Sequence, residues 1–174
     1  MKKKESGQTL LEALIALSTA VIIISAMTVM VLSSLNNAQF SKNQNQATQY
    51  AQPGIEVLKN TSQSDWTAFA VNNGSYCLSQ DSTTLIQTPV SPGCAQSPYI
   101  INNLFVRDVV ISQYLAGDIT TIGYADCQPT SVTRAKVTVT VSWSDNKCTS
   151  AMDPYCHKIP LVSCIYNSTT ILPP

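Results

Sequence analysis

The pattern of hydrophobic and polar positions changes near residue 35. Residues 13–32 carry no charge, and Glu12 is the only charged residue between residues 8 and 35. Twenty helical residues rise about 30 Å, the thickness of the hydrocarbon core of a bilayer. Three consecutive lysines at residues 2–4 precede this run, and cytoplasmic flanks of membrane helices are enriched in Lys and Arg. We therefore predict a transmembrane helix at about residues 13–32, with the N-terminus inside and the rest of the chain outside.

The next segment, residues 36–52, is polar but has helical periodicity. It contains five glutamines and four asparagines, with no glycine or proline. Near one side of a helix lie Phe40, Ala47, Tyr50, Ala51 and Gly54, which leaves the amides on the other side. The pattern predicts that the membrane helix continues into an amphipathic half that packs on a globular head.

Pro53 is expected to kink or restart this helix, because proline removes a backbone donor and clashes with the preceding turn. Residues 54–59 can add another turn or two before the polar cluster at residues 60–64 ends it. The predicted helical spine is therefore residues 8–60, and residues 61–174 form the head.

Period-two alternation predicts the strands of the head. In residues 132–143, polar residues alternate with Ala135, Val137, Val139, Val141 and Trp143, which gives one buried and one wet face. Residues 158–167 are the expected hairpin partner, with Pro160 at an edge or bulge, and residues 144–157 are the loop between them. Residues 99–112 predict one strand or two short ones. The expected fold class is α+β, a long N-terminal helix packed on a small antiparallel sheet.

Charge composition narrows the functional classes. Lys+Arg and Asp+Glu each number 10 among 174 residues, and only 11% of residues are charged. The basic residues of the head are spread along the predicted strands and loop: Arg107, Arg134, Lys136, Lys147 and Lys158. A nucleic-acid surface needs a basic patch or stripe, so no nucleic-acid partner is predicted.

All six cysteines follow the apolar run: Cys77, Cys94, Cys127, Cys148, Cys156 and Cys164. An even number in an extracytoplasmic domain predicts three disulfides, for which six cysteines allow fifteen pairings. The pairing we expect among these is Cys148–Cys156 across the hairpin loop, Cys77–Cys94 across a Gly/Pro/Ser-rich segment, and then Cys127–Cys164.

No motif for a metal or for catalysis stands out. Successive cysteines are at least eight residues apart, so there is no C-x₂₋₄-C zinc knuckle. Asp145, Asn146 and Asp153 offer oxygen atoms to calcium, but they lack EF-hand spacing and turns use such residues routinely. His157, the only histidine, adjoins Cys156, but adjacent strand residues point to opposite faces. We predict no metal, no cofactor and no enzymatic activity, and we interpret His157 as an ordinary surface residue.

Glu12 needs an explanation of its own, because an acid in a membrane helix costs about 2.5–3.5 kcal/mol at the helix centre and less near its end. A snorkelling salt bridge to the preceding lysines explains it within one chain. A secretory signal peptide has an apolar core of about 7–15 residues, which is shorter than this run. A plain single-pass anchor explains the length of the run but not Glu12.

Residues 7–12, Gly-Gln-Thr-Leu-Leu-Glu after a lysine-rich leader, resemble the class III signal of type IV prepilins and pseudopilins. The resemblance implies a leader of residues 1–7, cleavage by a prepilin peptidase between Gly7 and Gln8, and N-methylation of Gln8. It also implies that Glu12 neutralises the N-terminal amine of a neighbouring subunit and sets register during assembly. The chain departs from the usual pattern in having Gln8 instead of phenylalanine, and no proline near residues 29–30.

The spine-to-head junction is similar to that of PilV-type minor pilins, on Ala51-Gln52, Gly54-Ile55-Glu56 and Asp65-Trp66. The resemblance implies a minor pilin or pseudopilin whose partners are other pilin subunits, prepilin peptidase and a membrane assembly platform. Such a chain resides in the cytoplasmic membrane and then in a cell-surface or periplasmic filament. Type IV pilus, type II secretion and DNA-uptake systems all remain open. So does the alternative, a single-pass membrane-anchored binding protein or adhesin that is not polymerised.

Overall fold

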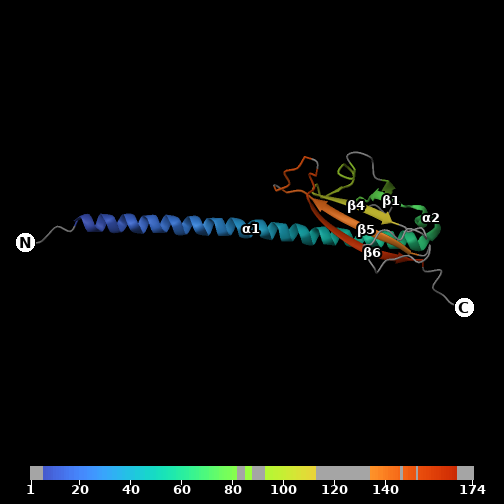
Figure 1. Ribbon diagram of the computed structural model, residues 1–174, viewed down its shortest axis with the longest axis horizontal. Coiled ribbons are helices and arrows are strands. Elements are labelled where there is room, and N and C mark those ends of the chain that lie inside the picture. Colours follow the sequence, from blue (N-terminus) through green and yellow to red (C-terminus); the bar gives the residue numbers. More distant parts are fainter. Residues whose placement is uncertain are drawn as a thin grey trace, which may run out of the picture. The chain divides into compact units, whose positions relative to one another are not determined.

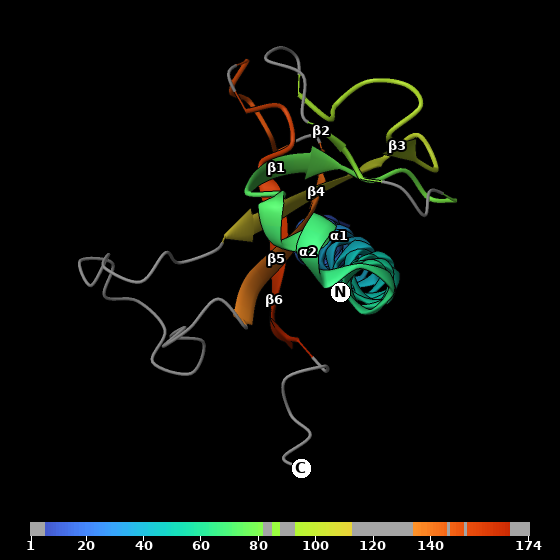
Figure 2. The same ribbon diagram turned by 90° about the vertical axis from the view of Figure 1, so that its right-hand side faces the viewer.

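The computed structural model describes residues 6–81, 85–87, 93–112, 134–145, 147–151 and 153–167. Its elements (Figures 1 and 2; β2 and β3 are labelled in Figure 2) are α1 (Ser6–Ser64), α2 (Trp66–Val71), β1 (Gly74–Cys77), β2 (Ile86–Gln87), β3 (Ile100–Ile101), β4 (Phe105–Ser112), β5 (Arg134–Trp143) and β6 (His157–Tyr166). The chain divides into two compact units, Met1–Lys42 and Asn43–Pro174. Helix α1 contributes to both units, and the sheet belongs to the second.

In the first unit, α1 exposes an almost continuous apolar surface. The large hydrophobic side chains that are more than half exposed are Leu10, Leu11, Leu14, Ile15, Leu17, Val21, Ile22, Ile23, Ile24, Met27, Val29, Met30, Val31, Leu32 and Leu35. The hydroxyls of Ser18, Thr19, Ser25 and Thr28 donate to carbonyls three or four residues earlier, so they add no unsatisfied polar group to this surface. The helix is thus long and apolar enough to cross a membrane, as predicted.

In the second unit, the remaining part of α1 packs on the sheet through a narrow stripe. Ala47, Ala51, Ile55 and Leu58 follow helical spacing and are at most 7% exposed. They belong to one core cluster with the inward residues of β4 and β5, and Figure 1 shows this part of α1 running along the strands. The predicted amphipathic half is confirmed.

Pro53 does not interrupt the helix, so the predicted restart is wrong: α1 is continuous from Ser6 to Ser64. Pro53 has no N–H to donate to the carbonyl of Gln49. Both residues lie on the exposed side of the helix, where water can replace the missing hydrogen bond. The buried residues Ala51 and Ile55 hold the helix against the sheet on either side of the proline. The end of α1 falls inside the predicted polar cluster, and Asp65 then caps α2 by accepting from Ala68 N at 2.9 Å.

Every strand pairing in the sheet is antiparallel, with the order β2-β1-β4-β5-β6 and β3 paired to β4. The predicted alternation of β5 is confirmed, since its five apolar positions are all buried. Strand β6 lies at one edge of the sheet, where proline is tolerated, and its Pro160 pairs with Thr140. Residues 99–112 form two strands, β3 and β4. His157 pairs with Trp143, so the hairpin loop is residues 144–156 and not 144–157.

Among the described residues, one charged side chain, that of Arg107 on β4, is buried in the core at 2% exposure. Its Nη1 donates to Tyr50 O of α1 at 2.8 Å, its Nε donates to Leu78 O at 3.2 Å, and its Nη2 donates to Ser79 O. Burial lowers the pKa of Arg107 by desolvation. The side chain therefore joins the helix, β4 and the segment after β1.

Two predicted disulfides are present in the head. Cys77–Cys94 joins the end of β1 to the segment before β3, and both cysteines are buried. Cys148–Cys156 closes the hairpin loop between β5 and β6. Cys164 on β6 is also disulfide-bonded, and its predicted partner Cys127 lies outside the described residues.

Candidate functional site

Glu12 is the single carboxylate in the part of α1 that belongs to the first unit, where the helix surface is apolar. Its neighbours one turn away are Thr9, Ile15 and Ala16, and its side chain is exposed. The lysines considered as its intrachain partners, at residues 2–4, lie outside the described residues, as does most of the predicted leader. Gly7 and Gln8, the predicted cleavage position, are helical.

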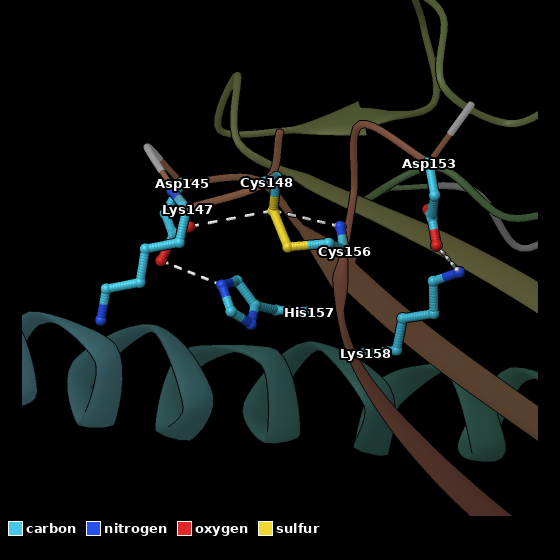
Figure 3. The surroundings of a disulfide bond; sticks show 7 residues. All are labelled: Asp145, Lys147, Cys148, Asp153, Cys156, His157 and Lys158. Atoms are coloured by element: carbon cyan, nitrogen blue, oxygen red, sulfur yellow. Dashed lines mark hydrogen bonds and ion pairs between the residues drawn. A yellow bond between two sulfur atoms is a disulfide. The ribbon is translucent and has the colours of Figure 1, made fainter. Parts of the chain in front are cut away.

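A second cluster of functional groups lies at the hairpin end of β5 and β6 (Figure 3). The last register pair, Trp143 and His157, stacks with ring centroids 5.3 Å apart and an interplanar angle of 27°. Two residues beyond Trp143, Asp145 Oδ2 lies 2.9 Å from His157 Nε2. The indole and the carboxylate thus orient the imidazole from its face and from its edge.

The turn after Asp145 brings the disulfide to the same place. Asp145 Oδ1 accepts from Lys147 N at 2.8 Å, and Asp145 O accepts from Cys148 N at 3.0 Å. Cys148 Sγ lies 3.8 Å from Asp145 Oδ1 and accepts from Cys156 N at 3.3 Å. These bonds fold the loop so that its sulfur atoms face the carboxylate.

We name Asp145, Cys148, Cys156 and His157 the loop cluster. One carboxylate oxygen, two sulfurs and one imidazole nitrogen of these residues all lie within 4.8 Å of one another. The two sulfurs are bonded to each other here, so the cluster holds a disulfide beside a carboxylate–imidazole pair.

The structure corrects two interpretations of this region. His157 is not an ordinary surface residue, because it stacks on Trp143 and faces Asp145 at an exposure of 21%. Cys156 and His157 do not point apart, because Cys156 precedes β6 and is not subject to strand alternation. Both contribute to the loop cluster.

The structure does not bring the candidate calcium ligands together. Asp145 faces His157, whereas Asp153 accepts from Lys158 Nζ at 2.7 Å. Figure 3 shows these two pairs on opposite sides of the disulfide. Asn146 lies outside the described residues.

The ionisation of Asp145 gives a pH prediction. Desolvation acts to raise the pKa of Asp145, but the hydrogen bond from Lys147 N and the contact with His157 act the other way, and the net pKa is lowered. A carboxyl with a lowered folded-state pKa stabilises the fold above its unfolded pKa of about 3.9, and this contribution is lost as pH falls through the folded pKa. We expect Asp145→Asn to lower the unfolding free energy at pH 6 and to match the wild type at pH 2.

Urea titrations at several pH values would measure this effect, with Asp153→Asn as the matched loop control. The ion pair of Asp153 with Lys158 is about half exposed and is therefore screened by solvent, so this control should follow the wild type. A constant difference between Asp145→Asn and the wild type from pH 6 to pH 2 would contradict the assignment.

Comparisons of the chain with family models, with curated proteins and with solved structures find no match. The chain's own features therefore define its class: a long N-terminal helix, apolar in its first part, packed in its second part on a small antiparallel sheet that carries disulfides.

Proposed function

We propose that this chain is a structural subunit, a minor pilin or pseudopilin, of a type IV pilus-like filament, and not an enzyme. The observation that carries the proposal is Glu12, a single carboxylate within the exposed apolar part of a helix whose second part packs in a head. A membrane anchor alone does not require an acid at this end of its apolar segment, where it still carries a cost. In a helix that assembles with copies of related helices, the acid can pair with a positive charge on a neighbouring helix.

The chemistry of assembly explains the position of the acid. Cleavage after Gly7 creates a new amine at Gln8, four residues before Glu12 in the same helix. Among packed apolar helices, an unpaired charge is expensive, whereas two opposite charges that meet in the polymer compensate each other. Contact between Glu12 of one subunit and the amine of its neighbour therefore favours addition in one register.

The exposed apolar surface supports the same proposal. Residues 10–35 present far more apolar side chains than a soluble monomer exposes. In the membrane, lipid covers this surface, and in a filament the equivalent helices of other subunits cover it. The head would remain outside, with its fold held by disulfides in an oxidising compartment. The partners of this function are other pilin subunits, prepilin peptidase and the membrane assembly platform.

Glu12→Gln tests the proposal in cells that contain a prepilin peptidase and a filament system that accepts the wild-type chain. We expect normal loss of residues 1–7 and methylation of Gln8, read by intact mass. Incorporation into sheared filaments should fall about tenfold or more, because loss of a charge pair among packed helices costs at least about 1.4 kcal/mol per subunit.

Glu56→Gln is the matched control, since Glu56 is an exposed glutamate of the same helix within the head unit. It should leave both processing and incorporation unchanged. Normal incorporation of Glu12→Gln, or a wild-type chain that a competent peptidase leaves uncut, would instead favour the anchored binding protein or adhesin.

A further inference from the structure

We propose that the loop cluster of Asp145, Cys148, Cys156 and His157 forms a zinc site when its disulfide is reduced. Zinc and the disulfide are then alternative ways of closing the same hairpin loop. The proposal concerns the head alone and does not depend on filament assembly.

The ligand set suits zinc. Zn²⁺ prefers thiolate, imidazole and carboxylate ligands in a four-coordinate tetrahedral arrangement, and the cluster offers two sulfurs, one nitrogen and one oxygen. Mg²⁺ and Ca²⁺ prefer oxygen ligands and are disfavoured by the two sulfurs. Bond lengths of about 2.0–2.3 Å place tetrahedral ligand atoms roughly 3.3–3.8 Å apart. The four donor atoms lie within 4.8 Å of one another, so shifts of about 1 Å would satisfy this geometry.

The positions of the ligands do not depend on the disulfide alone. Asp145 and His157 stand at the end of a ten-residue antiparallel register in which Trp143 pairs with His157. Stacking on Trp143 fixes the plane of the imidazole, as outer-shell contacts do for metal-bound histidines. Cys148 follows Asp145 by three residues, and the hydrogen bond from Cys148 N to Asp145 O keeps the two residues close in space. Cys156 directly precedes His157, so all four ligands remain close when the sulfurs separate.

The two states are related by a balanced exchange. A dithiol reductant transfers two electrons and two protons to the Cys148–Cys156 bond, which breaks to give two thiols while the reductant becomes its own disulfide. Zn²⁺ then binds both sulfurs as thiolates, and the two thiol protons are released to water. Binding also replaces the direct contact between Asp145 Oδ2 and His157 Nε2 by two bonds to the ion.

Accessibility separates this disulfide from the other described one. Cys156 is exposed and Cys148 is partly exposed, whereas Cys77 and Cys94 are at most 2% exposed. A reductant in solution therefore reaches the loop cluster more readily than the bond in the core.

Cobalt is the probe for the experiment, because Co²⁺ takes the place of zinc and acquires visible and thiolate charge-transfer absorption when sulfur ligands bind it. The full chain in detergent micelles is reduced with a phosphine, desalted without oxygen and titrated with Co²⁺. We expect one Co²⁺ per chain with thiolate absorption, and bleaching of that absorption by one equivalent of Zn²⁺. The oxidised chain should give no such absorption.

Variants assign the signal to the loop cluster. Cys148→Ser with Cys156→Ser retains the other four cysteines and should lose the absorption. His157→Phe keeps a ring on Trp143 but removes the nitrogen ligand, so Co²⁺ should bind at least about 10–100-fold more weakly. Asp153→Asn, the neighbouring loop carboxylate, should bind as the wild type does.

Three results would overturn the proposal: a reduced wild-type chain that does not bind Co²⁺, retained absorption in the double serine variant, or equal affinity of His157→Phe and wild type. Circular dichroism of each variant with and without metal separates loss of a ligand from loss of fold.

Discussion

Replacing Arg107 with methionine is expected to lower the free energy of unfolding of the head by about 3 kcal/mol. The guanidinium donates to three backbone carbonyls, those of Tyr50, Leu78 and Ser79. Hydrogen bonds from charged groups contribute about 1.5–3 kcal/mol each, and a buried acceptor left unsatisfied costs about 1–3 kcal/mol. The cost of desolvating the guanidinium, which also lowers the pKa of Arg107, offsets part of this sum.

Urea unfolding of the full chain in micelles, followed by the fluorescence of Trp66 and Trp143, measures the change. Arg134→Met on β5 is the matched control, because Arg134 lies over the ring of Tyr166 at 5.2 Å and should cost under about 1 kcal/mol. Arg107→Lys should also destabilise, since an ammonium cannot reach three separated carbonyls as the planar fork does. Equal unfolding free energies for Arg107→Met and Arg134→Met would show that the three carbonyls find other donors.

Much of the fold was predictable because strong periodicities carry it. The apolar run, the helical stripe around Ala47 and Ala51, and the alternation of β5 each repeat a simple pattern over many residues. Helix α2 and strands β1 and β2 lack such a signal and were not predicted. Strand β1 has the sequence Gly-Ser-Tyr-Cys and is a strand because it pairs with β4 and β2. Tertiary pairing, not local preference, determines such short elements.

Pro53 is a strong local signal that tertiary packing overrides. Its local chemistry predicts a kink or a restart, but α1 is continuous, and buried contacts on both sides of the proline hold the helix on the sheet. Packing outweighs the local preference of proline here because the missing backbone hydrogen bond lies on the solvent side of the helix.

The candidate sites differ in how well they can be predicted from the sequence. Glu12 is visible from sequence alone, because a charge within an apolar run needs no partner to be noticed. The loop cluster has no zinc-knuckle spacing along the chain, so the sequence does not reveal it; the β5–β6 register brings Asp145 and Cys148 beside Cys156 and His157. By composition, Arg107 is one of five basic residues spread along the head. Its position between Phe105 and Val109 at period two was the available signal, since both neighbours point into the core.

Gly54→Ala is expected to destabilise the head by about 1–2 kcal/mol, although alanine is ordinarily the better helix residue by about 1 kcal/mol. A Cβ added at Gly54 would lie 2.9 Å from Val139 Cγ1 and 3.3 Å from Arg107 Cδ. Val139 is fully buried in the middle of β5, paired with Val109 and Leu161, and its branched side chain has little rotamer freedom. Overpacking of this kind costs about 1–3 kcal/mol or more, and Gly54→Leu should exceed the effect of Gly54→Ala.

A double-mutant cycle with Val139→Ala identifies the contact. Val139→Ala removes the methyl groups that the added Cβ meets, so Gly54→Ala in that background should be neutral or stabilising, with a coupling energy of at least about 1 kcal/mol. Val137→Ala is the matched control, because Val137 is equally buried on the same face of β5 while the atoms nearest the added Cβ belong to Val139 and Arg107. Its effect should add to that of Gly54→Ala. Additivity with Val139→Ala as well would mean that α1 moves away from β5 as a unit, and that the glycine is not required for their close approach.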